Sequence, residues 1–255
     1  MTDNPTKVNI PWNPQDVDFI FHSYQIFERK FVDILRVLPL TKENEQSWSP
    51  ELVNLFLDIS SLVDSVSRNI IGLGKNNNDT VQIKGLTDIS ISRKVGKLNI
   101  DDFETNLFSD LKLFESRVVV YVYPLQVIKP YKDYRNIDMD GWWSIYNLLK
   151  HNRIKNYNKA NLINVLNALA GLFLLLVRYK EEEFSKALFR LGWLEIGIMP
   201  EFVHQERVRE AWNFWYDTEL FGTHELSENV PEDIATINPV LTSQKFRKFF
   251  GRFNP

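Results

Sequence analysis

Two long stretches of the chain repeat apolar residues at intervals of three and four, which is the spacing of one face of an α-helix. The first stretch covers about residues 14–38 and stops at Pro39. The second starts with Ser49 as N-cap and Pro50 at the first helical position, and it ends at Gly72. Only a short polar connector separates the two stretches. Together they predict an antiparallel pair of long helices.

The second half of the chain predicts further helices. Asp138 or Asp140 can cap a helix over about residues 141–150. A fourth helix is expected over about 159–182, and a shorter amphipathic helix follows it. The apolar run 168–177 within this segment is far shorter than the roughly 20 residues that a membrane span needs. It therefore predicts a buried core helix and no membrane contact.

The pattern between these two helical parts is different. Residues 75–100 carry no strong helical period and predict a loop with one short helix or strand. Asp101 or Asp102 can cap a short helix after this loop. Residues 117–123 and 125–129 are rich in β-branched and aromatic side chains, which favour extended structure. A small hairpin beside the helical body is expected there.

The expected fold is mainly α. Residues 1–196 would form a bundle of four to five helices, interrupted by a small extended or β insertion at about 73–135. Residues 197–255 would form a C-terminal extension packed on this domain. Within the extension, 207–216 predicts a helix, and the basic and aromatic segment 245–252 predicts an amphipathic one.

Composition excludes several classes of function. The chain has 255 residues and no cysteine, which rules out disulfides, thiolate zinc sites and cysteine nucleophiles. Its net charge of -3 gives no bulk attraction to nucleic acid, so such a contact must come from a local patch. The histidines do not match a recognised metal site, and no metal or cofactor is expected. The first residues lack the order of a signal peptide, which predicts a cytoplasmic protein.

One group of side chains points to chemistry. Asn147 and His151 are four residues apart and share one face of the predicted helix 141–150 and its end, with Lys150 beside them and Arg153 just beyond. A neutral imidazole here could remove the proton of an RNA 2'-hydroxyl while the cations stabilise charge on phosphorus. The alternative is structural, because basic residues also interact favourably with the negative end of a helix dipole.

Residues 146–151, Tyr-Asn-Leu-Leu-Lys-His, resemble the motif of the HEPN superfamily of helical domains. Many HEPN domains are RNases of toxin, abortive-infection and CRISPR-linked defence systems. The family motif is an arginine, usually followed by a polar residue, with a histidine four to six residues further on. Asn147 and His151 match it, whereas Tyr146 stands in place of the arginine. The resemblance implies that Lys150 or Arg153 supplies the missing positive charge.

The resemblance extends in helix order over residues 14–190. It implies a HEPN-like, metal-independent endoribonuclease or RNA-binding protein of a toxin, phage-defence or stress system. The RNase would be a homodimer, in which two motif helices form one cleft, with a neutralising or defence-system partner protein. The alternative is a catalytically inactive α-helical protein–protein interaction module that retains the fold.

The second predicted helix adds two candidate residues. Asp64 and Arg68 lie four residues apart on one face, and in HEPN-like folds this helix packs against the motif helix. With Tyr146 they are the predicted substrate-binding residues: Asp64 would orient His151 or Arg153, and Arg68 would contact a phosphate. An ion pair within the helix is the structural alternative.

Two further patterns have both a structural and a functional interpretation. Asn161, Asn164 and Asn167 form a polar stripe, which indicates hydrogen bonds to neighbouring helices or loops, or contact with a second protomer. Trp142 and Trp143 could stack on bases, but two large rings at a helix start more often anchor it in the core.

Overall fold

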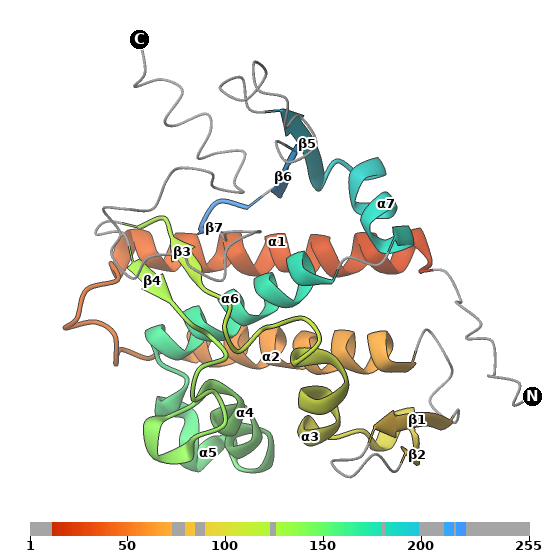
Figure 1. Ribbon diagram of the computed structural model, residues 1–255. Coiled ribbons are helices and arrows are strands. Elements are labelled where there is room, and N and C mark those ends of the chain that lie inside the picture. Colours follow the sequence, from red (N-terminus) through yellow and green to blue (C-terminus); the bar gives the residue numbers. More distant parts are fainter. Residues whose placement is uncertain are drawn as a thin grey trace, which may run out of the picture.

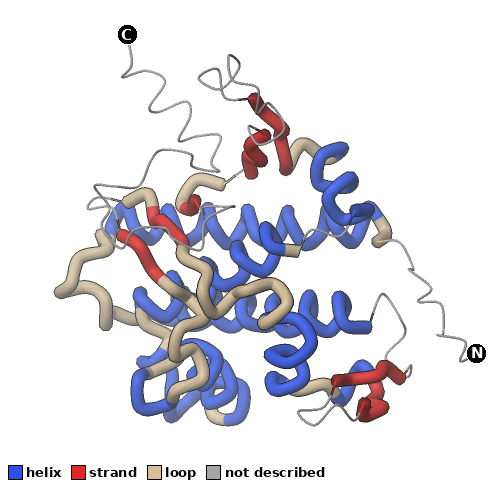
Figure 2. The backbone as a smooth tube through the Cα atoms, in the orientation of Figure 1, coloured by secondary structure: helices blue, strands red, loops and turns tan. Residues whose placement is uncertain are grey.

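The computed structural model describes residues 12–72, 80–84, 90–122, 126–179, 182–198, 212–216 and 218–222. Its body is helical, and short strands lie at the edges (Figures 1 and 2). Helix α1 spans Pro14–Val37 and α2 spans Pro50–Gly72, and the two pack together as the predicted pair. The main-chain N–H of Gln15 donates to the Asn13 side chain at the start of α1, and the N–H of Leu52 donates to Ser49 Oγ at the start of α2. Local capping therefore sets both helix starts.

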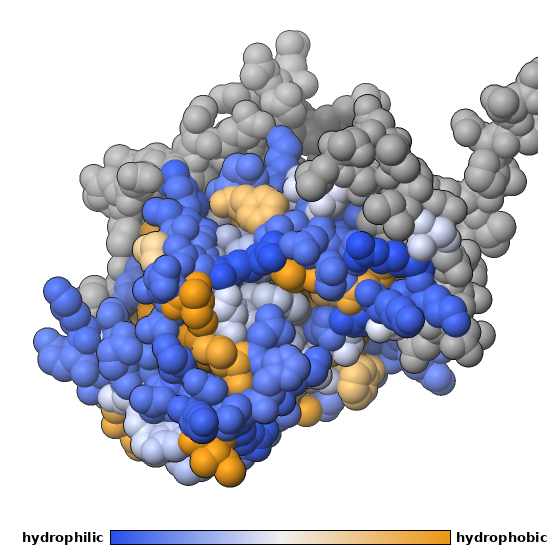
Figure 3. Space-filling model, turned by 90° about the horizontal axis from the view of Figure 1, so that it is seen from below, coloured by the Kyte–Doolittle hydropathy of each residue, from blue (hydrophilic) through white to orange (hydrophobic). Residues whose placement is uncertain are grey.

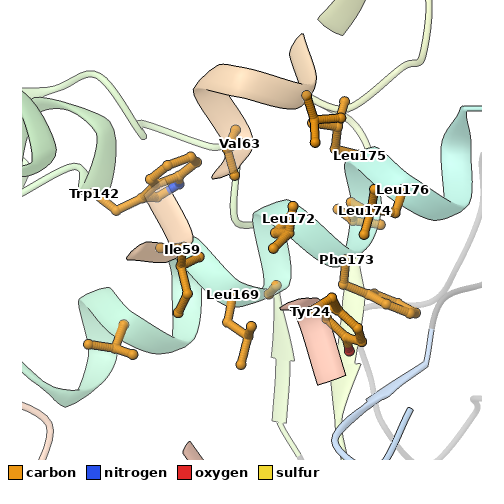
Figure 4. Close-up of a cluster of buried hydrophobic side chains, with 14 of the residues drawn as sticks. Tyr24, Ile59, Val63, Trp142, Leu169, Leu172, Phe173, Leu174, Leu175 and Leu176 are labelled. Atoms are coloured by element: carbon orange, nitrogen blue, oxygen red, sulfur yellow. The ribbon is translucent and has the colours of Figure 1, made fainter. Parts of the chain in front are cut away.

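Helix α6 (Leu162–Arg178) is the centre of the core. It packs against α1, α2 and α4, and it is apolar nearly all round because every side is covered. Figure 4 shows its leucines between Trp142 on one side and Tyr24 on the other. The helix is shorter than the predicted 159–182, since Asn161 is its N-cap and accepts a bond from the N–H of Asn164.

The candidate site is carried by α4 (Trp142–His151), which leads directly into the short helix α5 (Arg153–Asn156). The expectation that Asp138 or Asp140 caps α4 is wrong. Gly141 is the N-cap, and no side chain bonds to the helix start. Asp140 has a left-handed backbone and pairs with Lys159 at 2.6 Å instead, while the N–H of Trp143 donates to the carbonyl of Tyr134. The remaining short elements here are the 3-10 helices η3 (Ile137–Met139) and η4 (Tyr157–Lys159).

The segment before the sheet is more structured than expected. Residues 80–84 and 90–94 form an antiparallel hairpin, β1 (Thr80–Lys84) with β2 (Ser90–Lys94), followed by the 3-10 turn η1 (Val95–Lys97). Neither Asp101 nor Asp102 is the cap of the next helix. Asn99 caps α3 (Ile100–Phe103) in a capping box with Asp102, and a π-helical turn, η2 (Glu104–Phe108), continues it.

The predicted hairpin at 117–129 is present and has a third strand. β3 (Val118–Val120) pairs with β4 (Gln126–Ile128) on one side and with β7 (Phe221–Gly222) on the other, all antiparallel. Part of the C-terminal extension is therefore built into the sheet.

The extension differs from the prediction in a second place. Residues 212–216 form strand β6 (Trp212–Tyr216), paired with β5 (Leu194–Ile198), where a helix over 207–216 was expected. Alternating aromatic residues suit a strand as well as a helix face, and pairing with β5 decides between them. The rest of that segment, and the basic end 245–252, lie outside the described residues.

The mainly α fold class is confirmed by this architecture. The last helix of the body is α7 (Glu182–Arg190), which packs on α1. No helix in the described ranges has both the length and the apolar character to cross a membrane.

Candidate functional site

The C-terminal end of α4 presents three of the predicted residues to solvent. Asn147, Lys150 and His151 are all exposed, and they lie on the side of α4 that faces away from α2 and α6. Within the described part of the chain, neither the His151 ring nor the Asn147 amide makes a hydrogen bond or ion pair. Both side chains are therefore free to contact a ligand.

Arg153 lies at the start of α5, directly after this helix end. Its guanidinium is exposed and donates a long hydrogen bond of 3.4 Å to Asn54 Oδ1 on α2. Asn152 separates the two helices and accepts a bond from the N–H of Lys155, which fixes the turn. The structure therefore gathers His151, Lys150, Arg153 and the exposed Lys155 on one turn of the chain.

Tyr146 does not share this exposure. Its side chain is 5% exposed and packs against Trp143, with ring centroids 5.4 Å apart. The Lys150 ammonium lies 5.4 Å from the centroid of the Tyr146 ring, a cation–π contact. The position of the motif arginine thus faces the core, so Tyr146 supports the helix while the cations beside it reach solvent.

Arg68 and Asp64 have partners other than those predicted from the family resemblance. Arg68 Nε and Nη2 donate to the Asp64 carboxylate at 3.1 and 3.0 Å. Arg68 Nη1 donates to the carbonyls of Leu98 at 2.6 Å and Val95 at 3.4 Å, and the guanidinium lies over the Phe103 ring. All three nitrogens of this guanidinium are engaged within the protein.

This pair also lies far along α2 from the helix end of α4. Arg153 contacts Asn54, and Arg68 follows Asn54 by fourteen residues, which is about 21 Å of helix. Asp64 is about 15 Å from Asn54 by the same measure. The structure therefore does not bring Asp64 and Arg68 together with His151 and Arg153, and the contacts of Arg68 hold the 95–98 turn against α2.

Substitution of Arg68 by methionine is expected to lower the free energy of unfolding by about 2 kcal/mol, because two carbonyls and a carboxylate lose their donor. Arg36→Met is the matched control, since Arg36 is exposed and pairs only with Asp33 one turn away; it should cost less than about 1 kcal/mol. Urea denaturation measures both. Equal losses for the two variants would contradict the structural role of Arg68.

The asparagine stripe on α6 forms internal hydrogen bonds. Asn161 Nδ2 donates to Gln46 Oε1 at 2.6 Å, which ties α6 to the loop between α1 and α2. Asn164 Nδ2 donates to the Lys159 carbonyl at 3.0 Å, and Asn167 Nδ2 to that of Ile163 at 2.9 Å. These amides have the partners that the core interpretation requires. Contact with a second protomer stays a prediction.

Both tryptophans at the start of α4 are packed. Trp142 is 2% exposed and Trp143 is 4% exposed, and Trp142 Nε1 donates to the Pro130 carbonyl at 2.7 Å. They anchor the helix and are not placed to stack on a base. The sequence patterns did not single out another aromatic pair, Trp48 and Tyr157, which lies exposed next to α5. Their separation by 109 residues leaves no local signal.

Hydrophilic residues cover most of the face on which α3, α4 and α5 lie, and separate apolar groups interrupt it (Figures 1 and 3). Among the described residues, no group of three or more histidine, aspartate and glutamate side chains is arranged to hold a metal ion. Comparison with protein-family models, with curated proteins and with solved structures finds no match to this chain.

Proposed function

We propose that this chain is a HEPN-like RNA-binding protein that contacts RNA with the turn between α4 and α5, and that it cleaves RNA there as a homodimer without a metal ion. The observation that supports this best is the exposure of His151 among three cations, Lys150, Arg153 and Lys155, on a turn fixed by internal hydrogen bonds. Local positive charge of this kind binds phosphate in a chain whose net charge is negative.

The reaction would be an internal transesterification. A neutral His151 nitrogen accepts the proton of a 2'-hydroxyl, whose oxygen attacks the adjoining phosphorus. The bond from phosphorus to the 5'-oxygen breaks, and that oxygen takes a proton from water. The products are a 2',3'-cyclic phosphate and a 5'-hydroxyl end. Arg153 and Lys150 would stabilise the negative charge that gathers on the phosphate oxygens, and Asn147 would position the ribose or phosphate.

A second candidate function is a catalytically inactive module that binds RNA or a partner protein. The burial of Tyr146 favours it, because the position of the family's arginine points into the core and cannot reach a phosphate there. On this alternative, Lys150, Arg153 and Lys155 retain affinity for a polyanion, while His151 has no partner that would complete a cleavage site.

Replacement of His151 by alanine separates the two functions. If the protein is a nuclease, we expect cleavage of single-stranded RNA to fall at least a hundredfold, since general base catalysis typically contributes 10²–10⁴-fold, while RNA affinity stays within a factor of two. His22→Ala is the matched control, because His22 is also exposed but lies on α1. Cleavage is measured with and without a chelator, and the product ends are checked for the cyclic phosphate.

Charge-neutralising variants test RNA binding independently of cleavage. Arg153→Gln should weaken binding and reduce the dependence of affinity on salt, by about 0.7 in the slope for each lost phosphate contact on a single strand. Arg36→Gln, an exposed arginine on α1, should change neither. Binding without cleavage would leave the inactive module, and the absence of RNA binding by the wild-type protein would overturn the proposal.

A further inference from the structure

Trp48 and Tyr157 form an exposed aromatic pair beside the basic turn. Their ring centroids are 4.5 Å apart with an angle of 55° between the planes, and the side chains are 45% and 41% exposed. Among the ring pairs formed by the described residues, this is the one in which both rings are exposed. Large aromatic rings are usually buried to satisfy the hydrophobic effect, so an exposed pair indicates a binding surface.

The main chain under this pair is held on both sides. Trp48 forms a β-bridge with Asn161, and Ser47 accepts a bond from the N–H of Leu162 at 2.9 Å. Tyr157 begins the 3-10 turn η4, which the bond from the N–H of Ala160 to its carbonyl closes. Both rings therefore stand on fixed backbone near the start of α6. A ligand that binds them pays little for ordering the chain.

Positive charge lies on one side of the pair. Arg153 precedes Tyr157 by four residues, and its contact with Asn54 places it about 6 Å along α2 from the helix start that follows Trp48. Lys155 is exposed on the same short helix. Glu51 is an exposed carboxylate in the first turn of α2. Phosphates would therefore follow the α5 side of the pair and avoid the α2 side.

The ring geometry also limits how a base can bind. Rings whose centroids are 4.5 Å apart already touch, so no base fits between them. A base can stack only on an outer face of one ring, and this requires an unpaired nucleotide. A duplex, whose bases are stacked on each other, offers only its end or its phosphates.

We propose that Trp48 and Tyr157 form a base-binding subsite, on which one unpaired nucleobase of RNA stacks while Arg153 and Lys155 hold the adjoining phosphates. The inference rests on the proposed function, because it requires RNA at the turn between α4 and α5. It adds a preference for unpaired bases next to that turn, which the cations alone would not give.

The test compares the affinity of three ligands of equal length for the full chain: an unstructured 2'-O-methyl strand, which cannot be cleaved by attack of a 2'-hydroxyl, the same strand as a duplex, and an abasic strand with the same phosphates. Trp48→Ala should weaken binding of the unstructured strand about tenfold, within the range for loss of one stacked base. It should leave the abasic strand unchanged. Trp48→Phe should restore most of the affinity, and Phe19→Ala, an exposed ring on α1, should have no effect.

The outcomes distinguish this inference from the function on which it rests. If the wild-type protein binds the strands and Trp48→Ala binds them equally well, the subsite is wrong while RNA binding stands. An equal loss for the abasic strand would also overturn base stacking. A change of oligomeric state without a change in RNA affinity would show that the pair contacts protein. If no strand binds the wild-type protein, the proposed function itself fails.

Discussion

Replacement of Glu28 by alanine is expected to lower the free energy of unfolding by about 3 kcal/mol, because several buried donors lose their acceptor at once. Glu28 is 3% exposed on α1. Its carboxylate accepts bonds from the Tyr24 hydroxyl and the Thr218 hydroxyl, and from the N–H groups of Glu219 and Leu220 at 2.8 and 3.0 Å. Thermal or urea unfolding measures the total loss.

The loss should be concentrated at the docking of the 218–222 segment. The N–H of Tyr121 donates to the Leu220 carbonyl at 2.7 Å, next to the pairing of β3 with β7. Hydrogen exchange at Tyr121 should therefore accelerate more in Glu28→Ala than exchange in α2. Uniform acceleration across the chain, or a loss of stability below 1 kcal/mol, would contradict the role of Glu28 in holding this segment.

The isosteric variant Glu28→Gln provides the control and a dependence on pH. Burial raises the pKa of Glu28 above its ordinary value of 4.5, although the hydrogen bonds to Thr218, Glu219, Leu220 and Tyr24 oppose this. The folded state therefore holds the proton more tightly than the unfolded state. As the pH rises from about 4.5 through the raised pKa, the wild-type protein should lose stability relative to Glu28→Gln. A difference that grows with pH would contradict this sign.

Replacement of Trp142 by alanine is expected to cost about 3–5 kcal/mol, the range for loss of a large buried ring. Trp142 packs between Tyr131, Tyr134 and Trp143, and its indole contacts the position of Gly171 so closely that a Cβ there would lie 3.1 Å from Cζ2. The neighbouring backbone cannot close the space fully, so a cavity would remain beneath the helix that carries His151.

Two controls separate the parts of this effect. Trp142→Phe keeps a ring but leaves the Pro130 carbonyl without its donor, and should cost about 2 kcal/mol. Trp48→Ala removes a ring that is 45% exposed and should cost less than about 1 kcal/mol. Calorimetry of the three variants gives the order. If Trp142→Ala were no more costly than Trp48→Ala, the packing of α4 on α6 would not depend on this ring.

The helix pair could be predicted because its signals are local. Asn13 and Ser49 accept bonds from N–H groups two and three residues away, so a short stretch of sequence contains both donor and acceptor. The exposed group on α4 could be predicted for a similar reason, since Asn147 and His151 share a face of one helix by their spacing alone.

The remaining features depend on residues far apart in the sequence. Asp140 is close enough to α4 to cap it, but Lys159 pairs with it, and a left-handed backbone directs the chain differently. Arg68 has a partner one turn away, as its spacing from Asp64 predicts, yet its bonds to Val95 and Leu98 depend on how the intervening hairpin folds.

The sequence by itself determined a mainly α chain, with the starts of its two long helices and a histidine beside cations at the end of a third. Only the tertiary structure decided that residues 218–222 complete the sheet through Glu28, and that Trp48 lies against Tyr157. The physical reason is range: helix caps and helix faces join residues within one or two turns, whereas a strand pair, a buried carboxylate and a ring contact select partners only when the whole core has packed.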